Sequence, residues 1–123
     1  MNKYSKRSRE ALSTCHPDLQ RLFEAVLPWF DHSILEGHRG EHEQNQAVLN
    51  KRSTLEWPDS EHNKLPSLAV DVMPYPINWS DIKRIEDFAR VVKCIAHSLE
   101  INIKWGGDWD TFVDMPHYEL REK

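Results

Sequence analysis

The sequence predicts an α+β fold in which a small, mainly antiparallel sheet is flanked by helices. Apolar residues recur at helical spacing in two long segments, and short apolar segments lie between and after them. Prolines and glycines separate these segments. The resulting order is helix, strand, helix, strand, helix, strand, strand, which implies this fold class.

The amino-terminal part of the chain begins with a basic segment, residues 3–9, which we expect to be solvated and partly frayed rather than bound to a polyanion. No apolar stretch follows it that would make a secretory signal. The first helix is expected to begin at Pro17 or Asp18. Its apolar face recurs at helical spacing and consists of Leu19, Leu22, Phe23, Val26 and Leu27.

The middle of the chain is predicted to hold two strands and one polar helix. Residues 30–36 form the first strand, which ends at Gly37. Residues 41–51 form the helix, and its inward face is Ala47, Val48 and Leu49. Residues 52–66 contain two prolines and are expected to be an ordered loop. Residues 68–72 are mostly apolar and are followed by prolines, which is typical of a short buried strand.

The longest helix is predicted to begin after Ser80 or Asp81, because both residue types cap helix amino termini. Residues 101–105 then form a strand, Gly106-Gly107 a turn, and residues 116–120 the closing strand. The apolar face of the long helix keeps nearly uninterrupted helical spacing over Ile82, Ile85, Phe88, Ala89, Val92, Ile95, Ala96 and Leu99.

Composition narrows the classes of protein to which the chain can belong. Its 123 residues suit one domain, residues 1–123, and its hydrophobic content of 39% is that of a soluble protein. A net charge of −4 offers no large basic field for nucleic acid, and no apolar run approaches the roughly 20 residues that cross a bilayer. Cys15 and Cys94 are expected to be free thiols in a reducing compartment. We therefore expect a cytosolic site of synthesis and no membrane insertion.

Four polar residues carry the candidate chemistry. We interpret His62, Asp71 and His117 as ligands of one Zn²⁺ ion, because two imidazoles and one carboxylate leave zinc an open position, as in catalytic sites. Asp114 stands three positions before the last ligand and is the candidate general base. Taken one at a time, these residues have plainer roles. An aspartate before Met115-Pro116 is typical of a turn, and a histidine near a chain end is typical of an exposed surface.

The motifs around these residues strengthen the metal hypothesis. They are a Ser-x-His at residues 60–62, an Ala-x-Asp at residues 69–71, and an acidic residue before a second histidine at residues 114–117. In this pattern the chain resembles the zinc peptidases that cleave cell-wall peptides, a family of D-alanyl-D-alanine carboxypeptidases and phage L-alanyl-D-glutamate endopeptidases. The family's commonest pattern has seven positions between histidine and aspartate, whereas nine separate His62 from Asp71 here. Pro66 offers an alternative turn in that interval.

Other segments extend the resemblance over almost the whole chain. Residues 36–40, together with Gln44, are similar to the family's Gly-x-Arg segment. Residues 105–109 are similar to the turn that precedes the last ligand in phage members, and residues 16–19 to the start of their amino-terminal helix. The resemblance implies a hedgehog/DD-peptidase-like fold, one zinc ion, and the ligand and base assignments given above. It also places Arg39 near the scissile carbonyl, where a guanidinium stabilises a developing oxyanion.

The activity that the resemblance implies is hydrolysis of a peptide bond in the bacterial peptidoglycan stem peptide. We expect an L-alanyl-D-glutamate endopeptidase that works as a monomer on the cell wall after release from the cytosol, as phage endolysins do. A D-alanyl-D-alanine carboxypeptidase and a non-catalytic zinc-containing binding module of the same fold are the alternatives. Asp114 favours an enzyme. Ser60 is expected either to contact substrate or to brace the loop that carries His62.

A second metal motif is present in the sequence. Residues 38–42 fit H-x-x-E-H, the inverted zinc motif, which requires one continuous helix. Gly37 and Gly40 disfavour that helix by about 1 kcal/mol each relative to alanine. We therefore interpret this motif as a chance match. Tryptophans are expected either in a substrate groove or in the core, namely Trp57, Trp79, Trp105 and Trp109.

Overall fold

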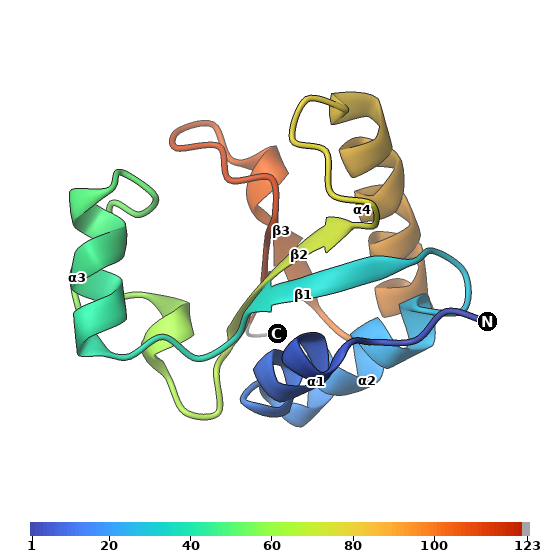
Figure 1. Cartoon of the computed structure of the whole chain (residues 1–123), viewed down its shortest axis with the longest axis horizontal. Helices are drawn as coiled ribbons and strands as arrows, with labels where there is room; N and C mark the ends of the chain where they lie inside the picture. Colours follow the sequence, from blue (N-terminus) through green and yellow to red (C-terminus); the bar gives the residue numbers. More distant parts are fainter. Residues whose placement is uncertain (122–123) are drawn as a thin grey trace.

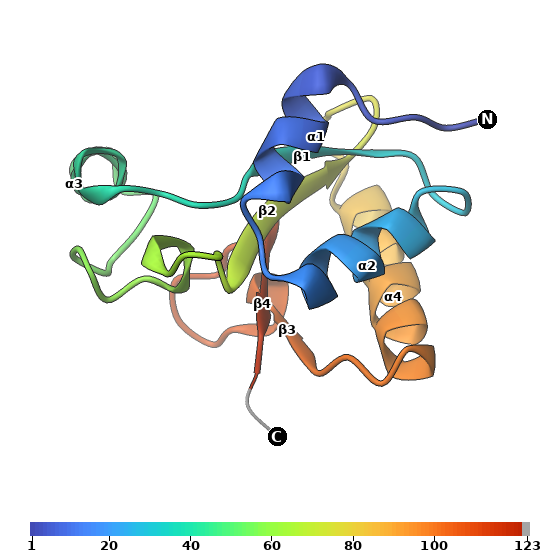
Figure 2. The ribbon, with the colours of Figure 1, turned by 90° about the horizontal axis from the view of Figure 1, so that it is seen from below.

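The computed structural model describes residues 1–121 and confirms the α+β class. Its four strands form one sheet in the order β1-β2-β4-β3, and every neighbouring pair is antiparallel (Figures 1 and 2). Two short 3₁₀ helices, at Glu61–Asn63 and Gly106–Asp108, precede β2 and follow β3. The regular elements are α1 (Lys6–Ser13), α2 (Pro17–Val26), β1 (His32–Glu36), α3 (Glu41–Leu49), β2 (Ala69–Pro74), α4 (Ile82–Ser98), β3 (Ile103–Trp105) and β4 (His117–Leu120).

Helix α1 replaces the frayed amino-terminal segment that the sequence analysis expected, and that expectation is wrong. The Ser5 hydroxyl caps the helix by accepting a hydrogen bond from the backbone N–H of Ser8 at 3.1 Å. The buried Ser8 hydroxyl in turn accepts from the backbone N–H of Ile34 at 3.0 Å, which ties α1 to β1. Because its inner face includes a serine and most other positions are charged, α1 lacks the apolar period by which helices are recognised.

Helices α2 and α4 lie side by side and enclose the main core with the sheet (Figure 2). Phe23 of α2 and Phe88 of α4 both contact the Tyr118 ring of β4, with ring centroids 5.5 and 6.2 Å apart. The predicted apolar faces of these helices are confirmed except at Leu27 and Ile82. Leu27 is half-buried and follows the end of α2 outside the core cluster, and Ile82 begins the first turn of α4 and is 46% exposed. No helix among the described residues has both the length and the apolar character needed to span a bilayer.

Helix α3 stands apart from the other helices at one end of the sheet (Figure 1). Its buried residues are Gln44 and Ala47, whereas Leu49, predicted to face inward, is 73% exposed. Helix α3 is anchored by the polar side chain of Gln44 rather than by an apolar face, and Leu49 is therefore left at the surface. The Gln44 side-chain amide donates to the carbonyl of Leu55 at 2.5 Å and to the hydroxyl of Ser53 at 3.0 Å. This anchor holds the loop after α3 against the helix.

Successive side chains of β2 point to opposite faces of the sheet, so this strand contributes both to the core and to the candidate site. Val70 and Val72 face the core, so Asp71 between them faces the opposite side of the sheet. In the antiparallel register Asp71 lies opposite His117 of β4 and, at a bulge, opposite Glu36 of β1. These three residues therefore form one row across three strands, and their side chains emerge on the same face.

A buried histidine in β1 makes the fold sensitive to acid. His32 is 2% exposed, its Nδ1 donates to the Phe30 carbonyl at 2.8 Å, and its Nε2 lies 2.5 Å from the Tyr4 hydroxyl. Burial lowers the pKa of His32 from 6.5 to about 4, against the opposing influence of the Phe30 carbonyl and Asp31. The neutral ring is thus the form that the folded state accommodates.

We expect stability to fall as the pH drops from about 6.5 to about 4, because the unfolded chain binds a proton in this window and folded His32 does not. The loss attributable to His32 is on the order of 3 kcal/mol. Urea unfolding at several pH values, compared with His32→Gln, measures it. The wild type should lose more stability than the variant across the window, and parallel curves would contradict the prediction.

Candidate active site

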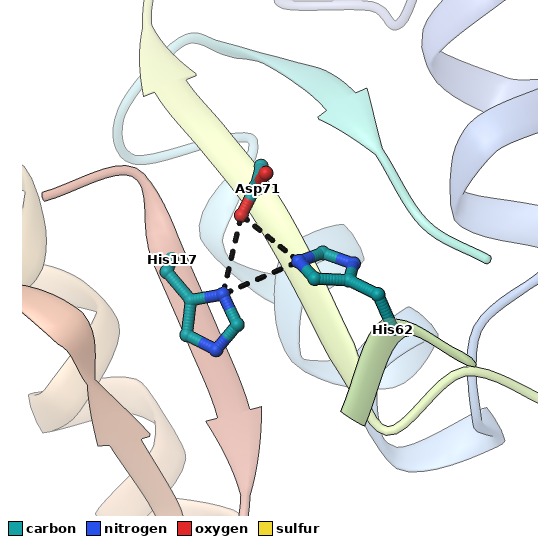
Figure 3. A group of neighbouring side chains, drawn as sticks. All are labelled: His62, Asp71 and His117. Carbon is teal, nitrogen blue, oxygen red and sulfur yellow. Dashed lines mark hydrogen bonds and ion pairs between the residues drawn. The ribbon is translucent and has the colours of Figure 1, made fainter. Parts of the chain in front are cut away.

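Two histidines and one aspartate converge on a single point of the exposed sheet face. His62 comes from the 3₁₀ helix Glu61–Asn63, Asp71 from β2 and His117 from β4 (Figure 3). His62 Nε2 lies 3.2 Å from Asp71 Oδ1 and 3.2 Å from His117 Nδ1, and His117 Nδ1 lies 3.4 Å from Asp71 Oδ1. Within residues 1–121 these three form the group whose side-chain atoms are arranged to hold a metal ion. The structure thus brings together the three predicted ligands.

The nine-residue interval between His62 and Asp71 does not keep the two apart. The backbone N–H of Leu68 donates to the Glu61 carbonyl at 3.1 Å, so the chain between them closes into a loop. Ser60 begins the 3₁₀ helix and accepts from the backbone N–H of His62 at 3.2 Å. The extra residues are therefore accommodated outside the site.

The outer nitrogen of each histidine is occupied, which directs the other nitrogen inward. His62 Nδ1 lies 2.8 Å from the carbonyl of Gly37, and His117 Nε2 lies 2.6 Å from Glu119 Oε1. Because a carbonyl and a carboxylate only accept, these ring nitrogens carry the protons. The inner nitrogens face each other and the Asp71 carboxylate, and they are the atoms available to a metal ion.

The spacing of the three inner atoms fits zinc. Ligands held about 2.0–2.2 Å from a tetrahedral zinc ion are separated from one another by roughly 3.3–3.6 Å. The three observed separations are 3.2, 3.2 and 3.4 Å, so two of them lie just below this range and one lies within it. Two imidazoles and one carboxylate are also a donor set that zinc accepts, with a fourth position left open. Geometry and chemistry therefore agree.

Charge within the site is concentrated on Asp71. Burial acts to raise the pKa of its carboxyl, but attraction to His62 and hydrogen bonding with His117 and His62 outweigh burial and hold that pKa far below the ordinary range. Its second oxygen, Oδ2, lies 3.6 Å from the Arg39 guanidinium. Asp71 is therefore an anion whose Oδ1 interacts with the two histidines and whose Oδ2 interacts with Arg39. For His117, burial lowers the pKa, but hydrogen bonds to Asp71 and Glu119 raise it to about 9.

Asp114 stands at the edge of the three ligands. Its Oδ2 lies 3.9 Å from His117 Nδ1, and its side chain is 24% exposed. Burial, together with repulsion from Asp71, raises its pKa to about 6, against attraction to His117, His62 and Arg39. A carboxyl with such a pKa is largely ionised at neutral pH yet accepts a proton readily, as a general base must.

The turn that carries Asp114 depends on Gly106. The backbone N–H of Asp114 donates to the Gly106 carbonyl at 3.0 Å, and that of His117 donates to the Asp114 carbonyl at 3.1 Å. A Cβ at position 106 would lie 2.2 Å from the Asp114 carbonyl oxygen, which is too close for any side chain. Glycine here allows the loop to fold back and place Asp114 beside His117.

Arg39 is buried, 6% exposed, and held on two sides. Its Nε donates to Glu36 Oε1 at 2.5 Å and its Nη1 donates to Gln44 Oε1 at 2.9 Å. The interaction with Asp71 described above uses Nη2. The guanidinium thus interacts with the second carboxylate oxygen of Asp71, a proposed ligand, and it also lines the groove over the site.

Two hollows meet above the ligands. A cavity of about 570 Å³ reaches Asp71, and a smaller hollow of about 50 Å³ reaches His62 and His117. The smaller hollow is also lined by Ser60 and Trp109, and the larger one by Trp79. The two hollows form one groove across the site, because they share Arg39, Arg52, Phe112 and Asp114.

The inverted motif at residues 38–42 does not form. Helix α3 begins at Glu41 after Gly40, so His38 lies outside the helix that contains His42. The tryptophans divide between the two expected roles. Trp105 is buried and its Nε1 donates to the Met115 carbonyl at 2.6 Å, Trp79 and Trp109 line the groove, and Trp57 lies elsewhere on the surface.

Glu119 is a site residue that the sequence analysis missed. It lies two positions after His117 on β4, and alternate residues of a strand share a face, so this spacing is the signal that would have identified it. We expect Glu119→Gln to weaken zinc binding about 10- to 100-fold, because an outer partner fixes and polarises the ligand histidine. Competition with a zinc chelator measures the affinity. An unchanged affinity, with fold and melting temperature preserved, would contradict this role.

Comparisons with known proteins find similar chains of one kind. A sequence model of a family described as phage L-alanyl-D-glutamate peptidase matches residues 1–121. The L-alanyl-D-glutamate peptidase of Escherichia phage T5 is 27% identical over 124 residues, which cover 97% of this chain and 89% of that protein. The crystal structure of the Serratia marcescens L-Ala D-Glu endopeptidase ChiX matches with a TM-score of 0.82 and 31% identity, covering 98% of this chain and 91% of that one.

Proposed function

The chain belongs to the phage L-alanyl-D-glutamate peptidase family of hydrolases, and from this premise we propose that it cuts the L-alanyl–D-glutamate bond of peptidoglycan stem peptides with the help of one zinc ion. The observation that carries the proposal is the near-equilateral triangle of His62 Nε2, Asp71 Oδ1 and His117 Nδ1. All three ligands come from one chain, so the site is complete in a monomer.

The three ligands have distinct roles in holding the ion. His62 and His117 would hold zinc as neutral donors with their outer protons directed to Gly37 and Glu119. The second proton that a pKa of about 9 leaves on His117 in the metal-free site would be released as zinc binds. Asp71 enters as an anion and leaves a site charge of about +1 when zinc is bound. Zinc in such a site acts as a Lewis acid that activates water and polarises a carbonyl.

Asp114 is the proposed general base and acid. Its carboxylate takes a proton from the attacking water and then delivers that proton to the amine of the departing D-glutamate residue. Both transfers use the same oxygen pair at the edge of the ligand triangle. Burial of Asp114 and its repulsion from Asp71 raise its pKa above that of an ordinary aspartate, which favours uptake of a proton from water.

Arg39 and Ser60 are proposed to support this chemistry. Arg39 holds Asp71 in place and lines the groove, where its charge favours a developing oxyanion on the scissile carbonyl. The Ser60 hydroxyl accepts a hydrogen bond from the backbone N–H of His62 and so helps to hold His62 in place. A contact of Ser60 with substrate stays a prediction.

Digestion of purified peptidoglycan tests the proposal. The zinc-loaded protein is expected to release new amino termini on D-glutamate, and mass spectrometry of the fragments identifies the bond. Fragments that have lost only a terminal D-alanine would assign a D-alanyl-D-alanine carboxypeptidase instead. No new termini with zinc bound would indicate a binding module. A chelator-treated sample and the Asp114→Asn variant are the matched controls.

A further inference from the structure

Three cationic side chains from distant parts of the chain line the larger cavity. Arg7 comes from α1, and Lys51 and Arg52 follow α3. Within residues 1–121 none of the three forms an ion pair, whereas Lys6, next to Arg7, lies 3.9 Å from Glu10. All three residues are exposed, so their charges are available to a ligand in the cavity.

The acidic residues of the same cavity are Glu36, Asp71 and Asp114, and none of them forms an ion pair with these cations. Glu36 and Asp71 are engaged by Arg39, at 2.5 and 3.6 Å, and Asp114 lies 3.9 Å from His117. Asp71 is in addition a proposed zinc ligand, and zinc would make the site more positive. The cavity therefore presents an excess of positive charge toward a ligand, which is typical of a carboxylate-binding site.

One backbone conformation at the cavity is unusual. Phe112 lines the cavity and is a non-glycine residue in the left-handed region, with φ of 45°. Such a conformation costs on the order of 1 kcal/mol and is typical of sites where function requires a particular side-chain direction. Lys51, with φ of 59°, is instead the ordinary left-handed end of α3, because its backbone N–H and that of Arg52 donate to the carbonyls of Val48 and Ala47.

The smaller hollow differs in size and character. At about 50 Å³ it admits only a small group, and its apolar lining includes Leu55, Trp109 and Phe112. The proposed substrate has the same asymmetry. On one side of the scissile bond stands alanine with a methyl side chain. On the other stands glutamate, which keeps one free carboxylate because only one of its two carboxyl groups continues the peptide.

We propose that Arg7, Lys51 and Arg52 bind the free carboxylate of the D-glutamate residue, and that the apolar residues of the smaller hollow, Leu55, Trp109 and Phe112, receive the alanine methyl group. This inference rests on the proposed function and gives the substrate one direction across the groove. The departing glutamate amine then lies beside Asp114, which lines both hollows. The cations serve substrate binding and take no part in bond cleavage.

Two synthetic stem peptides that differ only at this carboxyl test the inference. One carries the free carboxylate of glutamate and the other a carboxamide. The zinc-loaded wild type is expected to favour the carboxylate peptide about tenfold or more in kcat/KM, mainly through KM, because a charge-assisted contact is lost with the amide. In the Arg7→Gln, Lys51→Gln, Arg52→Gln triple variant the ratio is expected to approach one.

The ratio makes the test robust, since a partly misfolded or zinc-poor preparation loses rate on both peptides alike. Lys104→Gln, an exposed cation on β3 outside the groove, is the matched control and should keep the wild-type ratio. Calorimetric binding of the glutamate-terminated product should weaken in the triple variant and at high salt.

Each outcome decides the inference. A wild-type ratio near one, with both peptides cleaved, would overturn the carboxylate site and leave the proposed peptidase intact. A ratio reduced equally by Lys104→Gln would attribute the preference to overall charge and also overturn it. Cleavage of neither peptide, together with no new termini from peptidoglycan, would remove the proposed function and the inference with it.

Discussion

Asp114→Asn is expected to lower kcat about a hundredfold or more while zinc stays bound. An amide is nearly the same size as the carboxyl, so the turn made by Gly106, Asp114 and His117 should remain, because its hydrogen bonds use backbone atoms. The amide has no lone pair basic enough to accept a proton from water. Activity is lost for lack of proton transfer rather than for lack of metal or fold.

Asp110→Asn is the matched control for this result. Asp110 lies in the same loop but is exposed and lines neither hollow of the groove. Steady-state kinetics on a defined stem peptide and zinc content by elemental analysis should be measured for both variants. An unchanged kcat in Asp114→Asn would exclude the residue from proton transfer. Loss of zinc would instead assign it to metal binding.

Asp71→Ala is expected to remove zinc and activity together. The substitution takes away the anionic ligand and leaves two neutral imidazoles, which are too few to hold zinc tightly. It also leaves the buried Arg39 with Glu36 as its remaining acidic partner. We therefore expect some loss of stability as well, and thermal unfolding of both metal-free proteins separates that loss from the loss of zinc.

A pair of histidine variants completes the test of the metal site. His62→Ala should lose zinc in the same way, whereas His42→Ala should retain it, because His42 is exposed on α3 and belongs only to the unformed inverted motif. Zinc content per chain after dialysis is the measurement. Tight zinc retention in Asp71→Ala or in His62→Ala would show that the ligand set is misassigned.

Periodicity predicted the elements that form the core. The helices α2 and α4 and the strand β2 follow their apolar spacing closely, because burial of one face against the sheet is what stabilises them. Helix α1 and the inner face of α3 were predicted less well. Both are anchored by polar contacts, through Ser8 and Gln44, and hydrogen bonds to distant backbone atoms leave no period in a sequence.

The sequence alone determined the α+β class, the family resemblance and the identity of the candidate ligands, since these depend on residue types and local motifs. Only the tertiary structure decided that His62, Asp71 and His117 meet within 3.4 Å. It also decided that Glu119 orients His117 and that Arg7 shares a cavity with Arg52. The physical reason is strand register. Pairing β2 with β4 places residues 46 positions apart side by side, and no local pattern encodes which row of the sheet they share.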